Sequence, residues 1–283
     1  NALVSAHAAA VDGDIITLSA GKFTYNSNQI TITKAVTIRG AGMMADTEHG
    51  IEPTSIDCSV IIAVAEKTEH LKLEGICFNW VFYGSGSLHI LEAATFEKCR
   101  IKELKQYGTG SNNTNRINNC TFKNCVVSNA HIVGSGIIFE NSYLHSNSIA
   151  NNVTARNCFV RGQEYFRRSN FTNCIISGSA HGLEEYCSAA YCLGIGSDTF
   201  NNLGETIGCN TVDTNVFKSW DDATNSDNLS AESYELSELG LQYQGIDGTQ
   251  IGMLGGNYPY NPIVSIPRIT RCEVAEKATA DGK

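Results

Sequence analysis

A small group of basic side chains stands out in a chain that is otherwise acidic. Arg161, Arg167 and Arg168 lie close together around Glu164, whereas the whole chain holds 20 Lys and Arg against 29 Asp and Glu residues. Clustered guanidinium groups can neutralise an anionic substrate beside a base that takes up a proton. These four residues are therefore candidate catalytic residues. The alternative is an exposed loop of solvated charges, which is the commoner role of such a run.

Paired carboxylates and isolated aromatic residues suggest a second kind of chemistry. The adjacent acids Glu184-Glu185 and Asp221-Asp222 are candidate general acid and base pairs for glycosidic bonds, although adjacent acids are more often surface turns. Tyr165, Tyr186 and Trp220 are candidate substrate-binding residues, because aromatic rings stack on sugar rings. Core or rim positions would explain the same three aromatic residues.

The cysteines and histidines give no indication of a metal site. The chain has 11 Cys and seven His residues, and pairs such as Cys120 with Cys125 lack the spacing of zinc knuckles. Buried free cysteines behave as small hydrophobic residues, which is the role we expect here. We therefore predict no resident metal, except that calcium remains compatible with an acidic-sugar substrate.

Charge and hydropathy exclude two classes of partner. The net charge of −9 disfavours nucleic acid, which requires basic stripes. The sequence contains no run of about 18 apolar residues, so it predicts no membrane-spanning segment. We expect a monomer that is either cytosolic or a mature exported form whose leader has been removed.

These candidate residues are carried by a chain that repeats one short phrase. Its members are Leu73-Glu-Gly75-Ile76-Cys-Phe78, Phe96-Glu-Lys98-Cys99-Arg-Ile101, Ile117-Asn-Asn119-Cys120-Thr-Phe122, Phe139-Glu-Asn141-Ser142-Tyr-Leu144, Ala155-Arg-Asn157-Cys158-Phe-Val160 and Phe171-Thr-Asn173-Cys174-Ile-Ile176. A drifting period of about 16–25 residues is typical of a solenoid. A second register, anchored on Cys125 instead of Cys120, fits almost as well.

The phrase predicts two short strands joined at a single-residue corner. Apolar residues occupy its first, fourth and sixth positions, so the alternation of a strand is interrupted between the first and the fourth. The third position is Gly or Asn in every member except the one with Lys98, and these residues enter the left-handed region most readily. We therefore predict an all-β fold, a single-stranded right-handed parallel β-helix. A β-sandwich has no need of such a corner.

The ends of the solenoid are also predicted. Residues 1–11 form a short capping helix with Leu3, Val4, Ala8 and Val11 near one face, and the β-helix with this cap extends over residues 1–256. Residues 41–60 and 102–116 are expected to be insertions between rungs, and the rhythm loosens after Gly178. Residues 257–283 are a proline-containing linker or strand, and the start of a further domain is one interpretation.

The opening of the chain resembles a known family. The motifs Asp12-Gly13-Asp14-Ile-Ile-Thr-Leu18, Ala20-Gly21-Lys-Phe-Thr-Tyr25 and Val36-Thr-Ile-Arg-Gly40-Ala-Gly42 are similar to the first rungs of the pectate-lyase-like β-helix superfamily. The later rungs resemble the same superfamily, so the resemblance covers most of the chain. It implies the fold and no particular activity, because that superfamily holds lyases, hydrolases, esterases and adhesins.

The resemblance suggests where catalysis would lie. Polysaccharide lyases of the superfamily abstract a sugar proton with Arg or Lys, often beside calcium, and Arg156, Arg161, Arg167 and Arg168 are the nearest equivalents here. Its hydrolases use Arg-Ile-Lys and His-Gly motifs. The matching segments Arg100-Ile101-Lys102 and Ala180-His181-Gly182 occur here in the reverse order, which indicates coincidence.

A later stretch resembles the closing turn of secreted β-helix proteins that are common in gut Bacteroidetes. It runs Asp247-Gly248-Thr249-Gln-Ile-Gly252-Met-Leu-Gly255-Gly256. The resemblance implies a protein that is secreted, periplasmic or on the cell surface. Two functions follow as hypotheses: binding or processing of polysaccharide along the parallel face, by a lyase or a glycoside hydrolase if it is an enzyme, or a non-catalytic structural or adhesion module that forms a rigid stalk.

Overall fold

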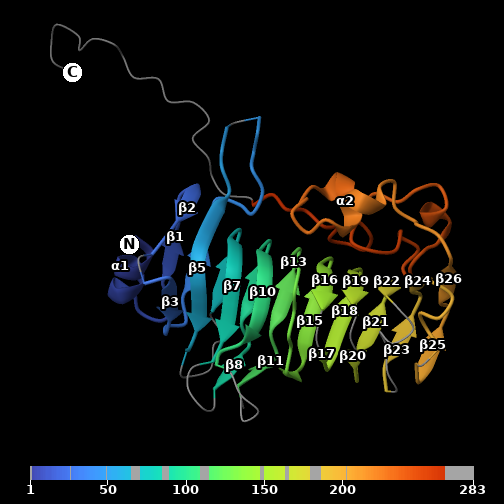
Figure 1. Ribbon diagram of the computed structural model, residues 1–283, viewed down its shortest axis with the longest axis horizontal. Coiled ribbons are helices and arrows are strands. Elements are labelled where there is room, and N and C mark those ends of the chain that lie inside the picture. Colours follow the sequence, from blue (N-terminus) through green and yellow to red (C-terminus); the bar gives the residue numbers. More distant parts are fainter. Residues whose placement is uncertain are drawn as a thin grey trace, which may run out of the picture.

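The chain coils into a parallel β-helix in the computed structural model (Figure 1). The structure describes residues 2–25, 27–48, 50–64, 71–84, 89–108, 115–146, 150–162, 166–178, 186–201 and 203–264. Every strand pair in its sheets is parallel, and the strands follow one another rung by rung. The parallel β-helix that the repeat predicts is confirmed.

Two long sheets form the coil. Sheet 1 has the order β1 (Ile15–Thr17), β4 (Thr37–Arg39), β6 (Lys72–Glu74), β9 (Thr95–Glu97), β12 (Thr121–Lys123), β15 (Ile137–Glu140), β18 (Val153–Arg156), β21 (Asn170–Thr172), β23 (Ser188–Ala190) and β25 (Glu205–Ile207). Sheet 2 has the order β2 (Gly21–Phe23), β5 (Thr54–Ile62), β7 (Cys77–Tyr83), β10 (Arg100–Gln106), β13 (Val126–Val127), β16 (Tyr143–Ser146), β19 (Phe159–Gly162), β22 (Ile175–Gly178), β24 (Leu193–Ile195) and β26 (Asn210–Val212), with β3 (Gln29–Ile32) paired to β5.

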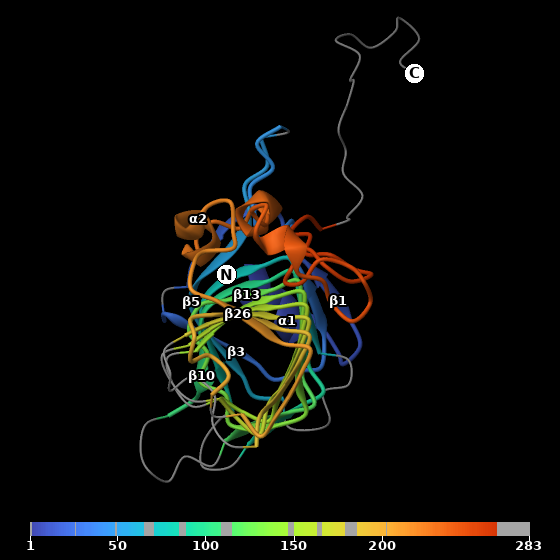
Figure 2. The ribbon, with the colours of Figure 1, turned by 90° about the vertical axis from the view of Figure 1, so that its right-hand side faces the viewer.

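A third side of the coil is shorter. It consists of β8 (Ile90–Glu92), β11 (Arg116–Asn118) and β14 (Gly134–Ser135), followed by the pair β17 (Ala150–Asn151) and β20 (Phe166–Arg167). We call these two groups sheet 3. In the end-on view of Figure 2 the rungs superpose into one closed loop. Inward residues stack in columns: the rings of Phe96, Phe122 and Phe139 are parallel, with successive centroids 4.6 Å apart.

The predicted corner joins sheet 1 to sheet 2. Gly75, Lys98, Asn141, Asn157 and Asn173 all have φ between 45° and 65°. The interpretation of that column as left-handed corners is confirmed, and even Lys98 adopts the conformation.

The preferred register of the third phrase was wrong. Phe122 pairs with Phe96 and Phe139 in sheet 1, so Asn124 and Cys125 occupy the corner to sheet 2. Asn119 and Cys120 lie instead at a second corner, between sheet 3 and sheet 1. Asn119-Cys120 and Asn124-Cys125 are the same dipeptide, so the sequence pattern alone allows both registers. The second corner also contains Ala93, Gly136, Asn152, Arg168 and Tyr186, each with positive φ.

The residue after each corner is usually Cys or Ser, and its side chain bonds to the neighbouring rung. The Cys125 N–H donates to Ser142 Oγ (3.0 Å). The Ser142 hydroxyl donates to Glu140 O of its own rung (2.7 Å) and, over a longer distance, to Phe122 O of the neighbouring rung (3.3 Å). Cys174 N–H donates to Cys192 Sγ (3.4 Å), and the Cys174 thiol donates to Ala155 O (3.4 Å). The expected role as small hydrophobic residues is therefore incomplete, because these side chains also satisfy backbone groups at the corner.

The coil is longer than the fading rhythm of the sequence indicates. Two further rungs follow Gly178, with left-handed corners at Tyr191 and Gly208, and the last strand ends at Val212. The predicted β-helix domain extends to residue 256, and the described residues 213–256 follow its last strand without adding another rung. The predicted insertion 41–60 was partly wrong, because Thr54 onward forms the long strand β5. The predicted insertion 102–116 likewise includes most of β10 and the first residue of β11.

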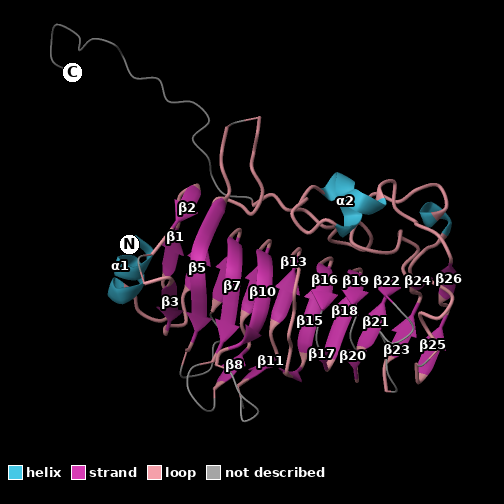
Figure 3. Cartoon of the chain, viewed as in Figure 1, coloured by secondary structure: helices cyan, strands magenta, loops and turns pink. Residues whose placement is uncertain are grey.

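The predicted N-terminal cap is α1 (Ala2–Ala9), which covers the first rung (Figure 3). Leu3 and His7 are buried beneath it, but Ala8 is exposed and Val11 is 65% exposed, contrary to expectation. Lys34 Nζ donates to the carbonyls of His7, Ala8 and Ala10, so a cation closes the C-terminal end of the helix.

Residues 213–264, here called the return segment, lie on the outside of sheet 2 and run back along the coil (Figure 1). They contain α2 (Trp220–Thr224) and the short 3-10 helices η1 (Ala231–Tyr234) and η2 (Gly240–Gln242). Their buried residues pack on the outward side chains of Val126, Tyr143, Phe159, Ile175 and Leu193 and form a second hydrophobic core.

Corner side chains hold the return segment in place. Asn141 Nδ2 donates to the carbonyls of Met253 (2.9 Å) and Gly255 (2.8 Å). Asn173 Oδ1 accepts from Ile246 N–H (2.9 Å), and Asn124 Oδ1 accepts from Asn261 N–H (2.8 Å). The glycines of the closing turn permit this approach, because a Cβ on Gly255 would lie 1.7 Å from Gln250 O. The first part of the predicted linker, residues 257–264, thus belongs to the return segment.

Ala93→Gly is expected to stabilise the protein. Ala93 has φ of 56°, a conformation that costs a side chain roughly 1–2 kcal/mol, and the entropy of glycine takes back about 0.5–1 kcal/mol. The free energy of unfolding in urea should rise by about 0.5–1 kcal/mol. Ala190→Gly, in strand β23, is the control and should lower it by a similar amount. Equal losses in both variants would contradict the strain at Ala93.

Ser142→Ala and Ser142→Cys separate packing from hydrogen bonding at the corner. Alanine leaves the buried Cys125 N–H without its acceptor, which should lower the free energy of unfolding by about 1–3 kcal/mol. Cysteine restores the residue type of the neighbouring rungs and should change it by less than about 1 kcal/mol. If alanine were tolerated as well as cysteine, the bond across the rungs would contribute little.

Candidate functional site

Arg161, the first candidate catalytic residue, is engaged in packing. It projects from β19 on the outer face of sheet 2, beneath the return segment. Its Nη1 donates to Tyr143 Oη (3.3 Å) and to the Thr224 carbonyl at the end of α2 (3.2 Å), and its guanidinium lies 5.7 Å from the Trp220 ring centroid. Arg161 therefore fastens α2 to the coil.

Trp220, a candidate sugar-stacking residue, packs inward as well. It is the half-buried first residue of α2, and its ring lies 6.2 Å from those of Phe159 and Phe217. Its neighbours Asp221 and Asp222 lie in the first turn of α2, where Asp222 Oδ1 accepts from Asn228 Nδ2 (3.1 Å). This arrangement accounts for Trp220 as a packing residue of the second core.

The other basic candidates lie on different parts of the coil. Arg167 ends β20 in sheet 3, and Arg168 is the exposed corner residue that follows it, with φ of 50°. Tyr186 is 75% exposed. It lies at the equivalent corner of the next rung, since Asn170, two residues after Arg168, pairs with Ser188, two residues after Tyr186. Arg168 and Tyr186 are therefore neighbours, whereas Arg161 belongs to sheet 2. The structure does not place the three arginines on one face.

The remaining predicted site residues lie outside the described residues. These are Glu164 and Tyr165, together with Glu184-Glu185 and the His181-Gly182 motif. The catalytic and binding roles assigned to Glu164 and Tyr165 stay predictions.

Sheet 1 has an outer face covered with ion pairs. Arg39 Nε lies 2.9 Å from Glu74 Oε2, and Lys72 Nζ lies 2.6 Å from Glu97 Oε2. These partly exposed pairs neutralise one another along the coil. The described strands of sheet 1 carry no outward aromatic side chain, so this face offers no platform for sugar rings.

The outer face of sheet 2 beyond the return segment does offer such a platform. Trp80 projects outward from β7 and is 40% exposed, and its indole N–H has no hydrogen-bond partner among the described residues. Phe82 lies two residues further along the same strand. The Tyr107 ring stands edge-on to Phe82, with centroids 6.1 Å apart. We call Trp80, Phe82 and Tyr107 the aromatic strip.

Polar side chains flank the aromatic strip in register. Ser59 and Glu103 pair with Trp80 on its two sides, and Gln29 pairs with Ser59. Lys105 pairs with Phe82, and its Nζ lies 5.2 Å from the Phe82 ring centroid and 2.7 Å from Glu103 Oε1. Hydrogen-bonding groups thus stand on both sides of an exposed indole.

The strip lies where sheet 2 bends. β5 has an extra residue opposite β7 between Ile56 and Ser59, and Asp57 at this bulge bonds Asn79 and also pairs with Lys22. A bulge bends its strand and increases the local twist, so we expect the face of sheet 2 to change direction here. Sequence reasoning missed Trp80. The available signal was a second step of three, between the inward residues Phe78 and Val81.

No family model, curated protein or solved structure matches the chain. The geometry of its surfaces therefore carries the functional argument.

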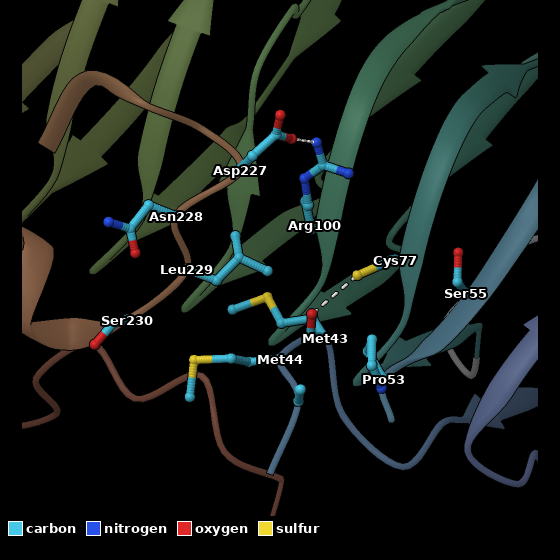
Figure 4. A pocket seen from close by; sticks show the side chains of 11 residues that line it. Met43, Met44, Pro53, Ser55, Cys77, Arg100, Asp227, Asn228, Leu229 and Ser230 are labelled. Carbon is cyan, nitrogen blue, oxygen red and sulfur yellow. Dashed lines mark hydrogen bonds and ion pairs between the residues drawn. The ribbon is translucent and has the colours of Figure 1, made fainter. Parts of the chain in front are cut away.

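A pocket of about 460 Å³ opens at the other half of the same strands (Figure 4). It lies between residues 43–45, residues 227–230 of the return segment and the start of β5, β7 and β10. Burial raises the pKa of the Cys77 thiol in its wall to about 12, and the thiol donates to Met43 O (3.0 Å). Cys77 is therefore protonated at neutral pH and unsuited to nucleophilic chemistry.

Metal-ligand clusters and membrane-spanning helices are both absent from the part of the chain that the structure describes. No group of three or more His, Cys, Asp or Glu side chains there is arranged to hold a metal ion. No helix there has the length and apolar character that crossing a membrane requires.

Arg161→Ala should release the return segment without unfolding the coil. It removes two hydrogen bonds from a charged donor and a cation–π contact, so opening near α2 should rise by at least about tenfold. Trypsin cleavage after Lys218, followed by mass spectrometry, measures this opening. Arg168→Ala is the charge-matched control and should be cleaved at the wild-type rate. Unchanged cleavage of Arg161→Ala would show that Arg161 is free for another role.

Proposed function

We propose that this chain is an exported β-helix protein of the pectate-lyase-like superfamily that binds polysaccharide on the aromatic strip. The observation that carries the proposal is Trp80, an exposed indole fixed on a rigid strand. A buried ring would be explained by packing, but the described neighbours leave 40% of this side chain exposed. Exposed aromatic platforms are suited to the apolar faces of sugar rings.

The surroundings of Trp80 favour an extended polysaccharide. Neighbouring strands are about 4.8 Å apart, so Gln29, Ser59, Trp80 and Glu103 form a row along the axis of the coil. The row combines the apolar ring of Trp80 with amide, hydroxyl and carboxylate groups, which can form hydrogen bonds with sugar hydroxyls. A chain lying along this row would meet several rungs at once.

Binding on the aromatic strip is favoured over cleavage near α2 by the packing roles already found for two candidate site residues. Arg161 holds α2, and Trp220 belongs to the second core. The described part of sheet 2 beside the strip brings no second carboxylate against Glu103, which pairs with Lys105. We therefore propose a non-catalytic glycan-binding module. The coil would act as its rigid support, which retains the stalk of the second hypothesis, and we propose that it works as a monomer.

Export is compatible with the many thiols. Nine of the ten described cysteines are buried, and Cys209 is half-buried. Burial also raises the pKa of Cys125, Cys174 and Cys192, which keeps their thiols protonated. Since the thiolate is the reactive form, such cysteines would resist oxidation outside the cell.

The test is binding to a panel of plant and host polysaccharides by affinity electrophoresis. Trp80→Ala should weaken binding to the preferred glycan by about tenfold or more, as is typical of a central aromatic contact. Tyr258→Ala is the matched control, because Tyr258 is 81% exposed on the return segment. Tyr186→Ala tests one of the aromatic residues that the sequence analysis identifies as a candidate substrate-binding residue.

The other outcomes discriminate between hypotheses. If Tyr186→Ala abolished binding and Trp80→Ala did not, the site would lie at the corner beside Arg168. If no glycan bound, a structural stalk would remain. Release of reducing ends, or of calcium-dependent unsaturated products, from the same panel would establish an enzyme instead.

A further inference from the structure

The guanidinium of Arg100 lines the pocket of Figure 4. Arg100 projects outward from β10, in register with Cys77 of β7 and, beyond it, Ser55 of β5. Its side chain is only 15% exposed. Within the described residues, Nε donates to Ser226 O (3.2 Å) and Nη2 to Asp227 Oδ1, while Nη1 has no partner.

The two members of the Arg100–Asp227 pair are buried very differently. The Asp227 side chain is 73% exposed, against 15% for Arg100. Figure 4 shows the carboxylate reaching the guanidinium from the loop at the pocket's edge. Asp227 can rotate into solvent at little cost, whereas Arg100 would lose a charged partner in a half-enclosed site. Another carboxylate can therefore replace Asp227 on the guanidinium, and the planar donors of Arg suit that group.

One side of the pocket wall is built from apolar side chains, while Ser55, Asn228 and Ser230 add polar groups to the lining. Met43, Met44, Pro53 and Leu229 line it, and Met43 and Leu229 belong to the second core. Methionine side chains adapt to ligands of different shape. Among the described residues that line the pocket, Arg100 alone is cationic. One cation beside this apolar part of the wall favours a ligand that has one negative charge and a hydrocarbon tail.

We propose that this pocket binds an amphiphilic monocarboxylate, such as a medium-chain fatty acid. Its carboxylate replaces Asp227 on Arg100, and its alkyl chain lies against Met43, Met44 and Leu229. A volume of about 460 Å³ is within the usual range of small-molecule pockets, roughly 300–1,000 Å³. The site is separate from the aromatic strip, so this inference stands independently of glycan binding.

The three methionines of the chain provide a direct test. Met43 and Met44 line the pocket, while Met253 is buried in the return segment beside Asn141. In a protein labelled at the methionine methyl groups, titration with octanoate should shift the Met43 and Met44 signals and leave Met253 unchanged. The same titration with 1-octanol, which has no charge, should need at least about tenfold more ligand.

Variants of the ion pair test the role of the charge. Asp227→Asn removes the competing carboxylate and should tighten octanoate binding by about threefold or more, since the ligand no longer displaces an anion. Glu235→Gln, which also removes an acid from the return segment, is the matched control and should leave affinity unchanged. Arg100→Gln should abolish the preference for octanoate over octanol.

Three results would overturn the proposal. They are no shift of Met43 or Met44 with octanoate, equal affinity for octanol and octanoate, and weaker binding of octanoate by Asp227→Asn. The first two are measured on the wild-type protein, so they hold even if Arg100→Gln fails to fold.

Discussion

The coil depends on hydrogen bonds across those corners where the neighbouring rung supplies a Cys or Ser side chain. A left-handed corner takes the backbone out of the parallel ladder, so the next N–H and a nearby carbonyl lose their strand partners. A thiol or hydroxyl one rung away is small enough for the crowded interior and serves both groups, as Ser142 does for Cys125 and Phe122. Valine or alanine would fill the same volume and leave those groups unsatisfied, at about 1–3 kcal/mol for each. The repeated Cys and Ser residues are therefore part of the backbone's hydrogen bonding.

The outward half of the same corners organises the return segment. Asn141 illustrates the double use: its backbone takes the left-handed conformation, and its side chain binds two carbonyls more than a hundred residues later in the sequence. Contacts of such separation form only after the rungs that present them are stacked. The second core over sheet 2, and with it the Arg100 pocket, therefore rests on side chains that the stacked rungs present.

Much of the fold could be predicted from the sequence because the corner imposes residue types. Gly75, Asn141, Asn157 and Asn173 were identified by that constraint alone. Asn119 was assigned to the wrong corner because Asn119-Cys120 and Asn124-Cys125 are the same dipeptide, and each of them occupies a left-handed corner. The two rungs after Gly178 lie within the predicted β-helix, but their rhythm is loose because Tyr191 occupies one corner and residues 179–185 interrupt the spacing.

The candidate site was much less predictable. An inward position is constrained by the core, but an outward position is constrained only by what later covers it. Trp220 and Arg161 therefore looked available in the sequence, and the return segment uses both. Trp80 was overlooked because β7 departs from simple alternation opposite a bulge in β5, and a bulge in one strand is not visible in the sequence of its neighbour.

The direction of the return segment determines how the molecule would respond to force. It leaves the last rung at Val212 and ends its described course at Val264, which lies against Gly75 near the first rungs. A load between Ala2 and Val264 would therefore act at one end of the rod. It would peel the segment from Lys98, Asn124, Asn141 and Asn173 in succession, breaking one anchor at a time at low force. The coil itself would carry tension only after the last of these contacts had broken. The return segment would therefore extend first and protect the stiffer coil from unfolding.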